Sequence, residues 1–119
     1  MPENSGLSAK RAKDGVKAQG LPDSNMTVAD LEALRVEIDR IDNSIAELLN
    51  ERIRLIRQVV EIKELLDLPT LDSEREKQVL ARVCASVADP EAIKLIEALY
   101  EKLFQLSREY QAAVRQRMK

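Results

Sequence analysis

The stretch "LNERIRLIRQVVEIKELL", Leu49–Leu66, decides how this chain folds, because it continues an apolar period that begins well before it. Apolar residues recur every three or four positions, at 31, 34, 38, 41, 45 and 48 and again at 55, 59, 62 and 66. This spacing is typical of one face of an α-helix. The step missing from the period falls on Arg52, whose side chain is always charged. We therefore predict one very long helix with a cation in the middle of its apolar face.

The composition favours an all-α fold with a core of aliphatic side chains. The chain has 119 residues, enough for one modest domain, and it is 45% hydrophobic but only 3% aromatic. Glycine occurs three times, whereas the good helix formers Ala, Leu, Glu, Lys and Arg are abundant. The 19 basic and 21 acidic residues leave a net charge of −2, which argues against general nucleic-acid binding.

Two residue types are scarce enough to exclude whole classes of chemistry. The chain has no histidine, which rules out histidine triads, histidine acid–base catalysis and histidine metal sites. Cys84 is its only cysteine, so it forms no intrachain disulfide and no cysteine cluster for zinc. No apolar run has the ~18 residues of a membrane span, and the N-terminus lacks the apolar core of a secretory signal. We expect a cytoplasmic protein without a metal or another cofactor.

The predicted organisation is a flexible tail followed by one helical domain. Residues 1–27 hold all three glycines and show no sustained apolar period, so we expect a mobile tail. The domain covers residues 28–119. Its first helix is capped by Thr27 or Asp30 and continues to about Leu66, shortly before Pro69.

Two further helices are expected after that proline. The second begins at Ser73, which together with Glu76 matches a capping box. The third has Asp89 as its N-cap and Pro90 at its first position, and it runs to about Met118.

The length of the first helix predicts association between chains. About 37 residues at ~1.5 Å each give a rod of ~55 Å, roughly twice the ~26 Å diameter of a 100-residue domain. A compact monomer cannot cover so long an apolar face. We therefore expect the helices of two chains to intertwine in a homodimeric bundle, with a long antiparallel or crossed pair of first helices.

Each predicted helix also carries polar residues on its apolar face. Taken singly, each of them has a structural explanation, such as fixing helix register or capping a helix. Inside a bundle, however, they must meet in a polar pocket or remain unsatisfied, at ~1–3 kcal/mol each. The cations would repel one another unless an anion lay between them, so the pocket suits a small di- or tri-anion that also bears a hydroxyl group. The residues are Arg52 and Lys63 on the first helix, Glu76 on the second, and Ser107 and Gln111 on the third.

Four segments resemble the all-helical, dimeric AroQ-type chorismate mutases. The segments are "ALRVEIDRID", "LLNERIRLIRQVVEIKE", "LDSEREKQVL" and "LSREYQ", and the resemblance covers about residues 28–117. It implies that the chain rearranges chorismate to prephenate in the biosynthesis of phenylalanine and tyrosine. It also implies a homodimer and a reaction that needs no cofactor.

The resemblance assigns a function to eight residues. Arg52, together with Arg35 from the neighbouring subunit, would hold the substrate carboxylates. Lys63 and Gln111 would hydrogen-bond the ether oxygen. The remaining residues would contact the ring hydroxyl or complete the polar lining of the site: Glu76 and the backbone at Asp72 for the hydroxyl, Arg75 and Ser107 for the lining and the carboxylates.

This reaction explains how a chain without histidine could be an enzyme. An intramolecular Claisen rearrangement needs neither a nucleophile nor a general base. Its barrier falls when the flexible dianion is held in its reactive chair conformation. It falls further when donors are already in place for the charge that develops on the ether oxygen.

The sequence is also compatible with other functions. Relatives of the same fold cleave isochorismate to salicylate and pyruvate, or rearrange aminodeoxychorismate. The resemblance suggests that the lyases lack the Arg75–Glu76 pair, which this chain retains. A non-catalytic helical dimer, in which the polar residues only set register, is the alternative of a different class.

Overall fold

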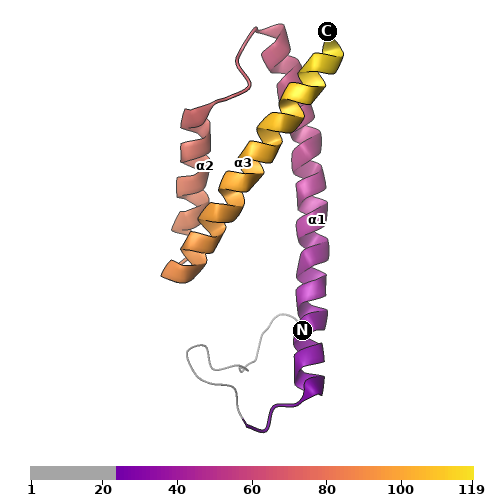
Figure 1. Ribbon diagram of the computed structural model, residues 1–119, viewed down its shortest axis with the longest axis vertical. Helices are drawn as coiled ribbons and strands as arrows, with labels where there is room; N and C mark the ends of the chain where they lie inside the picture. Colours follow the sequence, from indigo (N-terminus) through magenta and orange to yellow (C-terminus); the bar gives the residue numbers. More distant parts are fainter. Residues whose placement is uncertain (1–23) are drawn as a thin grey trace. The chain divides into compact units, whose positions relative to one another are not determined.

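The computed structural model describes residues 24–119, and this part of the chain is all-α, as predicted (Figure 1). The helices are α1 (Val28–Leu65), α2 (Ser73–Ala85) and α3 (Pro90–Met118). The chain divides within α1 into two compact units, Met1–Ile45 and Ala46–Lys119. Most of the predicted tail, residues 1–27, lies outside the described residues. Within them, no helix is long and apolar enough to cross a membrane, and the cytoplasmic location stays a prediction.

The unit up to Ile45 contains the beginning of α1, which is held by a reciprocal cap. The Thr27 hydroxyl accepts a hydrogen bond from the Asp30 backbone N–H at 3.3 Å, and the Asp30 carboxylate accepts one from the Thr27 N–H at 2.7 Å. Two backbone donors at the helix N-terminus are satisfied in this way. Thr27 is therefore the N-cap, one of the two predicted residues.

In the unit from Ala46 onward, α1 ends in a left-handed residue. Asp67 has φ of 56°, and the Leu68 N–H donates to the Lys63 carbonyl at 2.8 Å. The Asp67 N–H donates to the Glu64 carbonyl at 3.3 Å. These two bonds form a Schellman motif, so the helix ends before the chain reaches Pro69.

The start of α2 differs from the prediction. Its N-cap is Asp72, whose carboxylate accepts a hydrogen bond from the Arg75 backbone N–H at 3.1 Å. Ser73 is the first helical residue. The predicted capping box of Ser73 and Glu76 is therefore wrong: two neighbouring residues both favour the cap position, and Asp72 occupies it.

In this unit α2 packs along α3, and the C-terminal part of α3 crosses the end of α1 (Figure 1). Asp89 caps α3 and Pro90 begins it, as predicted. Tyr100 and Phe104 pack edge to face, with 5.7 Å between ring centroids. The four buried apolar residues among those described are Val60 of α1, Val79 of α2, and Phe104 and Val114 of α3.

The predicted apolar face of α1 is mostly exposed in the single chain. Ile62 and Leu66 are 55% and 60% exposed, whereas Val60, outside that period, is fully buried. The intrachain contacts of α1 thus use a neighbouring stripe, and the long apolar face is left uncovered. The same is true of its earlier members, which are 45–67% exposed: Leu31, Leu34, Ile38, Ile41, Ile45 and Leu48.

Candidate active site

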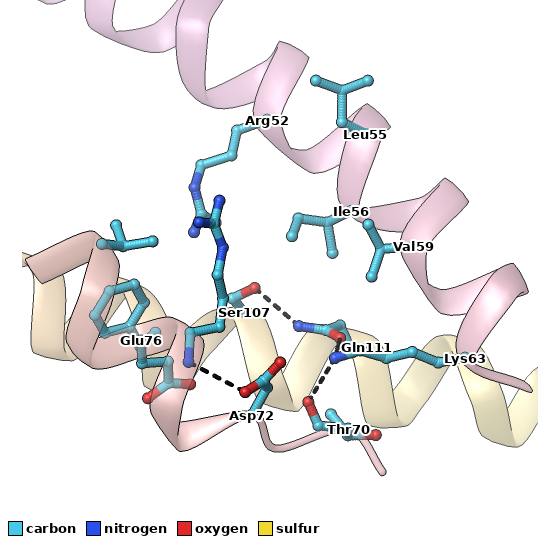
Figure 2. A pocket seen from close by; sticks show the side chains of 13 residues that line it. Arg52, Leu55, Ile56, Val59, Lys63, Thr70, Asp72, Glu76, Ser107 and Gln111 are labelled. Carbon is cyan, nitrogen blue, oxygen red and sulfur yellow. Dashed lines mark hydrogen bonds between the residues drawn. The ribbon is translucent and has the colours of Figure 1, made fainter. Parts of the chain in front are cut away.

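A cavity of about 460 Å³ lies among the three helices of the unit from Ala46 onward (Figure 2). This volume is typical of sites for small molecules. One wall is apolar, and the polar groups come from all three helices and from the loop between α1 and α2. The lining residues are Arg52, Leu55, Ile56, Val59, Lys63, Thr70, Asp72, Arg75, Glu76, Val79, Phe104, Ser107 and Gln111.

Arg52 and Lys63 both reach the cavity from α1. Eleven residues separate them, about three turns, so they project from nearly the same face. Both are half-buried. Figure 2 shows the Arg52 side chain extending from α1 toward α2 and α3. A guanidinium group in this position presents a planar fork of donors to whatever occupies the cavity.

Lys63 is held at the opposite end of the cavity by two hydrogen bonds. Its ammonium group donates to the Thr70 backbone carbonyl at 2.8 Å and to the Gln111 side-chain oxygen at 3.4 Å. An ammonium group has three N–H donors, so one is left over from these two contacts. The arrangement fixes the ammonium at the cavity surface and keeps a donor for a ligand.

Gln111 and Ser107 complete this polar end from α3. Gln111 is only 6% exposed, and its amide N–H donates to the Ser107 hydroxyl at 3.2 Å (Figure 2). Its oxygen already faces Lys63, so the second amide N–H is the group that a ligand could use. The two residues lie one helical turn apart on the inward face of α3, as predicted.

Two residues of α2 and its N-cap form the remaining polar wall. Asp72 lines the cavity and also caps the helix through its carboxylate. Arg75 adds a third cation to the lining, and Glu76 adds a carboxylate. Both oxygens of Glu76 accept hydrogen bonds from Arg108 of α3, at 2.6 and 2.7 Å.

Arg115 of α3 makes hydrogen bonds to the end of α1 and to the loop that follows it. Its guanidinium donates to the Glu64 carboxylate at 3.0 Å, to the Leu68 carbonyl at 2.7 Å and to the Thr70 hydroxyl at 3.2 Å. The hydrogen bond from Arg115 holds the pKa of Glu64 below its ordinary value; the charges of Arg115 and Lys119 add to this effect, and burial opposes it. Since Thr70 also accepts from Lys63, Arg115 steadies the same loop that positions the ammonium group.

Arg35 is not among the residues that line this cavity. It lies in the first unit, is exposed, and pairs with Glu32 one turn away at 2.9 Å. The structure thus brings together seven of the eight predicted site residues. The predicted contribution of Arg35 from a neighbouring subunit stays a prediction.

The comparison with known families agrees with this geometry. The sequence model of chorismate mutase type II matches residues 34–112, about two thirds of the chain. The chain belongs to the chorismate mutase type II family. The predicted family and its all-helical fold are therefore confirmed.

The chain matches most of one curated relative and a small part of two longer ones. The chain is 38% identical over 85 residues to a chorismate mutase of Methanocaldococcus jannaschii, which covers 67% of this chain and 86% of that protein. It is 44% identical over 54 residues to the bifunctional chorismate mutase/prephenate dehydratase of Aquifex aeolicus, and 43% over 54 residues to the T-protein of Enterobacter agglomerans. These two matches cover 45% of this chain but only 15% and 14% of the longer proteins. No solved structure gives a significant match.

Three residues that support this candidate site were missed from the sequence. Arg108 and Arg115 follow Phe104 and Gln111 by four residues each, a spacing that places them beside the inward face of α3. This four-residue spacing could have indicated both arginines as neighbours of the site. Thr70 acts on Lys63 through its backbone carbonyl, so its residue type carried no signal.

Proposed function

We propose that this chain rearranges chorismate to prephenate, as part of phenylalanine and tyrosine biosynthesis. The observation that carries the proposal is one cavity in which cations, a carboxylate and an amide meet, in a chain of the chorismate mutase type II family. The reaction breaks an ether C–O bond while a C–C bond forms within the same molecule. The catalyst therefore needs to hold a conformation and stabilise charge, and the lining supplies both kinds of group.

The cations of α1 and α2 suit a substrate with two carboxylates. Arg52 and Arg75 can each bind a carboxylate through paired N–H donors. With both carboxylates held, the flexible enolpyruvyl side chain is kept over the ring in the reactive chair. Proximity of this kind replaces entropy that would otherwise be lost in reaching the transition state.

Lys63 and Gln111 are placed to stabilise the breaking bond. Negative charge grows on the ether oxygen in the transition state, and donors that are fixed in advance lower its energy most. The third N–H of Lys63 and the second amide N–H of Gln111 are such donors. Contacts with Thr70 and Ser107 hold these two groups in place before the substrate arrives.

The rest of the lining fits the neutral parts of the substrate. The Glu76 carboxylate can accept a hydrogen bond from the ring hydroxyl. The apolar wall can pack on the ring and exclude water, which strengthens the electrostatic contacts inside. This wall consists of Leu55, Ile56, Val59, Val79 and Phe104.

We further propose that the functional form is a homodimer with Arg35 contributed across subunits. The uncovered apolar face of α1 supports this, because soluble monomers rarely expose large apolar patches. In an antiparallel pair of first helices, Arg35 of one chain would lie near Arg52 of the other. It would add a further cation for the substrate carboxylates.

The proposal is tested by incubating the purified chain with chorismate and following chorismate loss and prephenate formation. Isochorismate is tested in parallel, because lyases of the same fold act on it. We expect prephenate from chorismate and little or no salicylate from isochorismate, since the Arg75–Glu76 pair lines the cavity. Salicylate as the main product would replace this proposal with the lyase, and turnover of neither substrate would favour a non-catalytic helical dimer.

A further inference from the structure

The Glu76 carboxylate is held on both oxygens by one group of another helix. Nη1 of Arg108 donates at 2.7 Å to Oε1 and at 2.6 Å to Oε2. Charge-assisted hydrogen bonds of this length are the strong ones in proteins. They join α2 to α3 through residues that are 32 positions apart in the sequence.

Arg108 makes this contact from outside the cavity. Glu76 lines the cavity, whereas Arg108 is absent from its lining. The two oxygens of an ionised carboxylate offer about four lone-pair sites, so a donor on one side leaves sites for a hydroxyl group on the other. A free glutamate side chain would sample several rotamers, and a partner that binds both oxygens selects one of them.

We propose that Arg108 is a positioning residue, which holds the Glu76 carboxylate in the orientation that accepts the ring hydroxyl of the substrate. The inference rests on the proposed function. Arg108 acts only through Glu76 and touches no part of the substrate. Its effect therefore depends on two things, the Glu76 carboxylate and the hydroxyl group that this carboxylate receives.

The solvent exposure of Arg108 and Glu76 helps to distinguish a positioning function of Arg108 from a contribution to stability. The side chains of Arg108 and Glu76 are 34% and 25% exposed. An ion pair that keeps this much access to solvent contributes less to stability than a fully buried one, because solvent screens the charges. Loss of Arg108 should therefore lower catalysis while the urea midpoint of unfolding stays close to that of the unmodified chain.

The experiment measures kcat and KM for the full chain with two substrates, chorismate and the analogue that carries hydrogen in place of the ring hydroxyl. The variants are Arg108→Gln, Arg108→Lys, Glu76→Gln and the double variant Arg108→Gln/Glu76→Gln. Arg117→Ala, which removes an exposed arginine from the same helix, is the matched control. Far-UV circular dichroism and urea unfolding check the fold of every variant.

We expect Arg108→Gln to lower kcat/KM for chorismate by roughly tenfold or more, the effect of losing a well-placed hydrogen bond. Arg108→Lys should lose less, because a charged donor is kept. With the dehydroxylated analogue, Arg108→Gln should match the unmodified chain. In the Glu76→Gln background, the loss of Arg108 should cause no further decrease, because the two residues act as one unit.

Other results would overturn the inference. An unchanged rate for Arg108→Gln with chorismate would show that Glu76 needs no support. An equal decrease with both substrates, or an undiminished decrease in the Glu76→Gln background, would show a general structural effect. If Arg108→Gln does not fold, Arg108→Lys is judged by the same comparisons. Failure of the unmodified chain to convert chorismate would refute the proposed function, a result distinct from all of these.

Discussion

Arg52 occupies the missing step of the apolar period of α1 and lines the cavity together with Leu55 and Val59 of the same period. Lys63, Glu76 and Gln111 line the same cavity from α1, α2 and α3. None of these residues stands out singly, because a lone polar residue on a helix face usually has a structural explanation. Their convergence on one cavity is what distinguishes a binding site from a set of register-fixing residues.

Among residues 24–119, Asp67 is the non-glycine residue with a positive φ. Its φ of 56° lies in the left-handed region, which costs a residue with a β-carbon ~1–2 kcal/mol. Glycine avoids most of this cost but loses ~0.5–1 kcal/mol through its greater freedom in the unfolded chain. Asp67→Gly should therefore stabilise the protein by roughly 0.5–1 kcal/mol.

Urea unfolding at one fixed chain concentration measures this change. Asp67→Ala is the control, because alanine keeps the β-carbon and should give no gain. A glycine variant no more stable than the original chain would contradict the assignment of Asp67 as the residue that ends α1.

At the scale of the helices, their number, order and approximate ends could be predicted from the sequence. Proline at the first position of a helix and a capping residue before it are local signals, so Asp89 and Pro90 marked the start of α3. The end of α1 was harder to predict, because the sequence does not show which aspartate adopts a left-handed backbone conformation. The N-cap of α2 was misplaced by one residue, since Asp72 and Ser73 are both good capping residues.

The candidate site could likewise be predicted only in part from the sequence. Side chains on the inward faces were identified by helical spacing, which depends only on sequence. Helical spacing did not identify the contacts between helices. These contacts depend on how α3 crosses the other two helices, as in the pairs Arg108–Glu76 and Arg115–Glu64. Such pairs are fixed by tertiary packing, and helical spacing alone does not state which charges will meet.

The contact between α3 and the end of α1 should make stability depend on pH. In the folded chain the pKa of Glu64 is lowered, chiefly because Arg115 donates a hydrogen bond to its carboxylate. A lowered pKa means that folding favours the ionised form, so its contribution is complete above the unfolded pKa of about 4.3. It is lost as the pH falls through the lower pKa of the folded state.

Glu64→Gln tests this dependence. The variant should be less stable than the original chain near pH 7, and the difference in urea midpoint should shrink at pH 3. Glu61→Gln removes one negative charge from the exposed side of the same helix as a control. A difference that stays constant or grows as the pH falls would contradict the Arg115–Glu64 contact.

At the scale of the whole molecule, the apolar face of α1 and the position of Arg35 lead to the same expectation of a shared site. If each site combines Arg35 of one chain with Lys63 of the other, Arg35→Ala and Lys63→Ala homodimers are both impaired at every site. A hybrid dimer has one intact site and one site with both changes. Half of the dimers are hybrids after complete exchange of an equal mixture, so roughly a quarter of the original activity should return.

Affinity tags of two kinds show whether the chains have exchanged. Activity that stays at the mean of the two homodimers after proven exchange would contradict the shared site. Sedimentation of the original chain over a range of concentrations shows alongside whether the associated form is a dimer.

The rate of prephenate formation by Lys63→Ala tests the central claim most directly, namely that donors fixed in this cavity stabilise the breaking ether bond. Loss of one such donor typically lowers kcat by on the order of 100- to 1,000-fold, and we expect at least this for Lys63→Ala with the helical content unchanged. A folded Lys63→Ala chain that forms prephenate at the original rate would contradict the account.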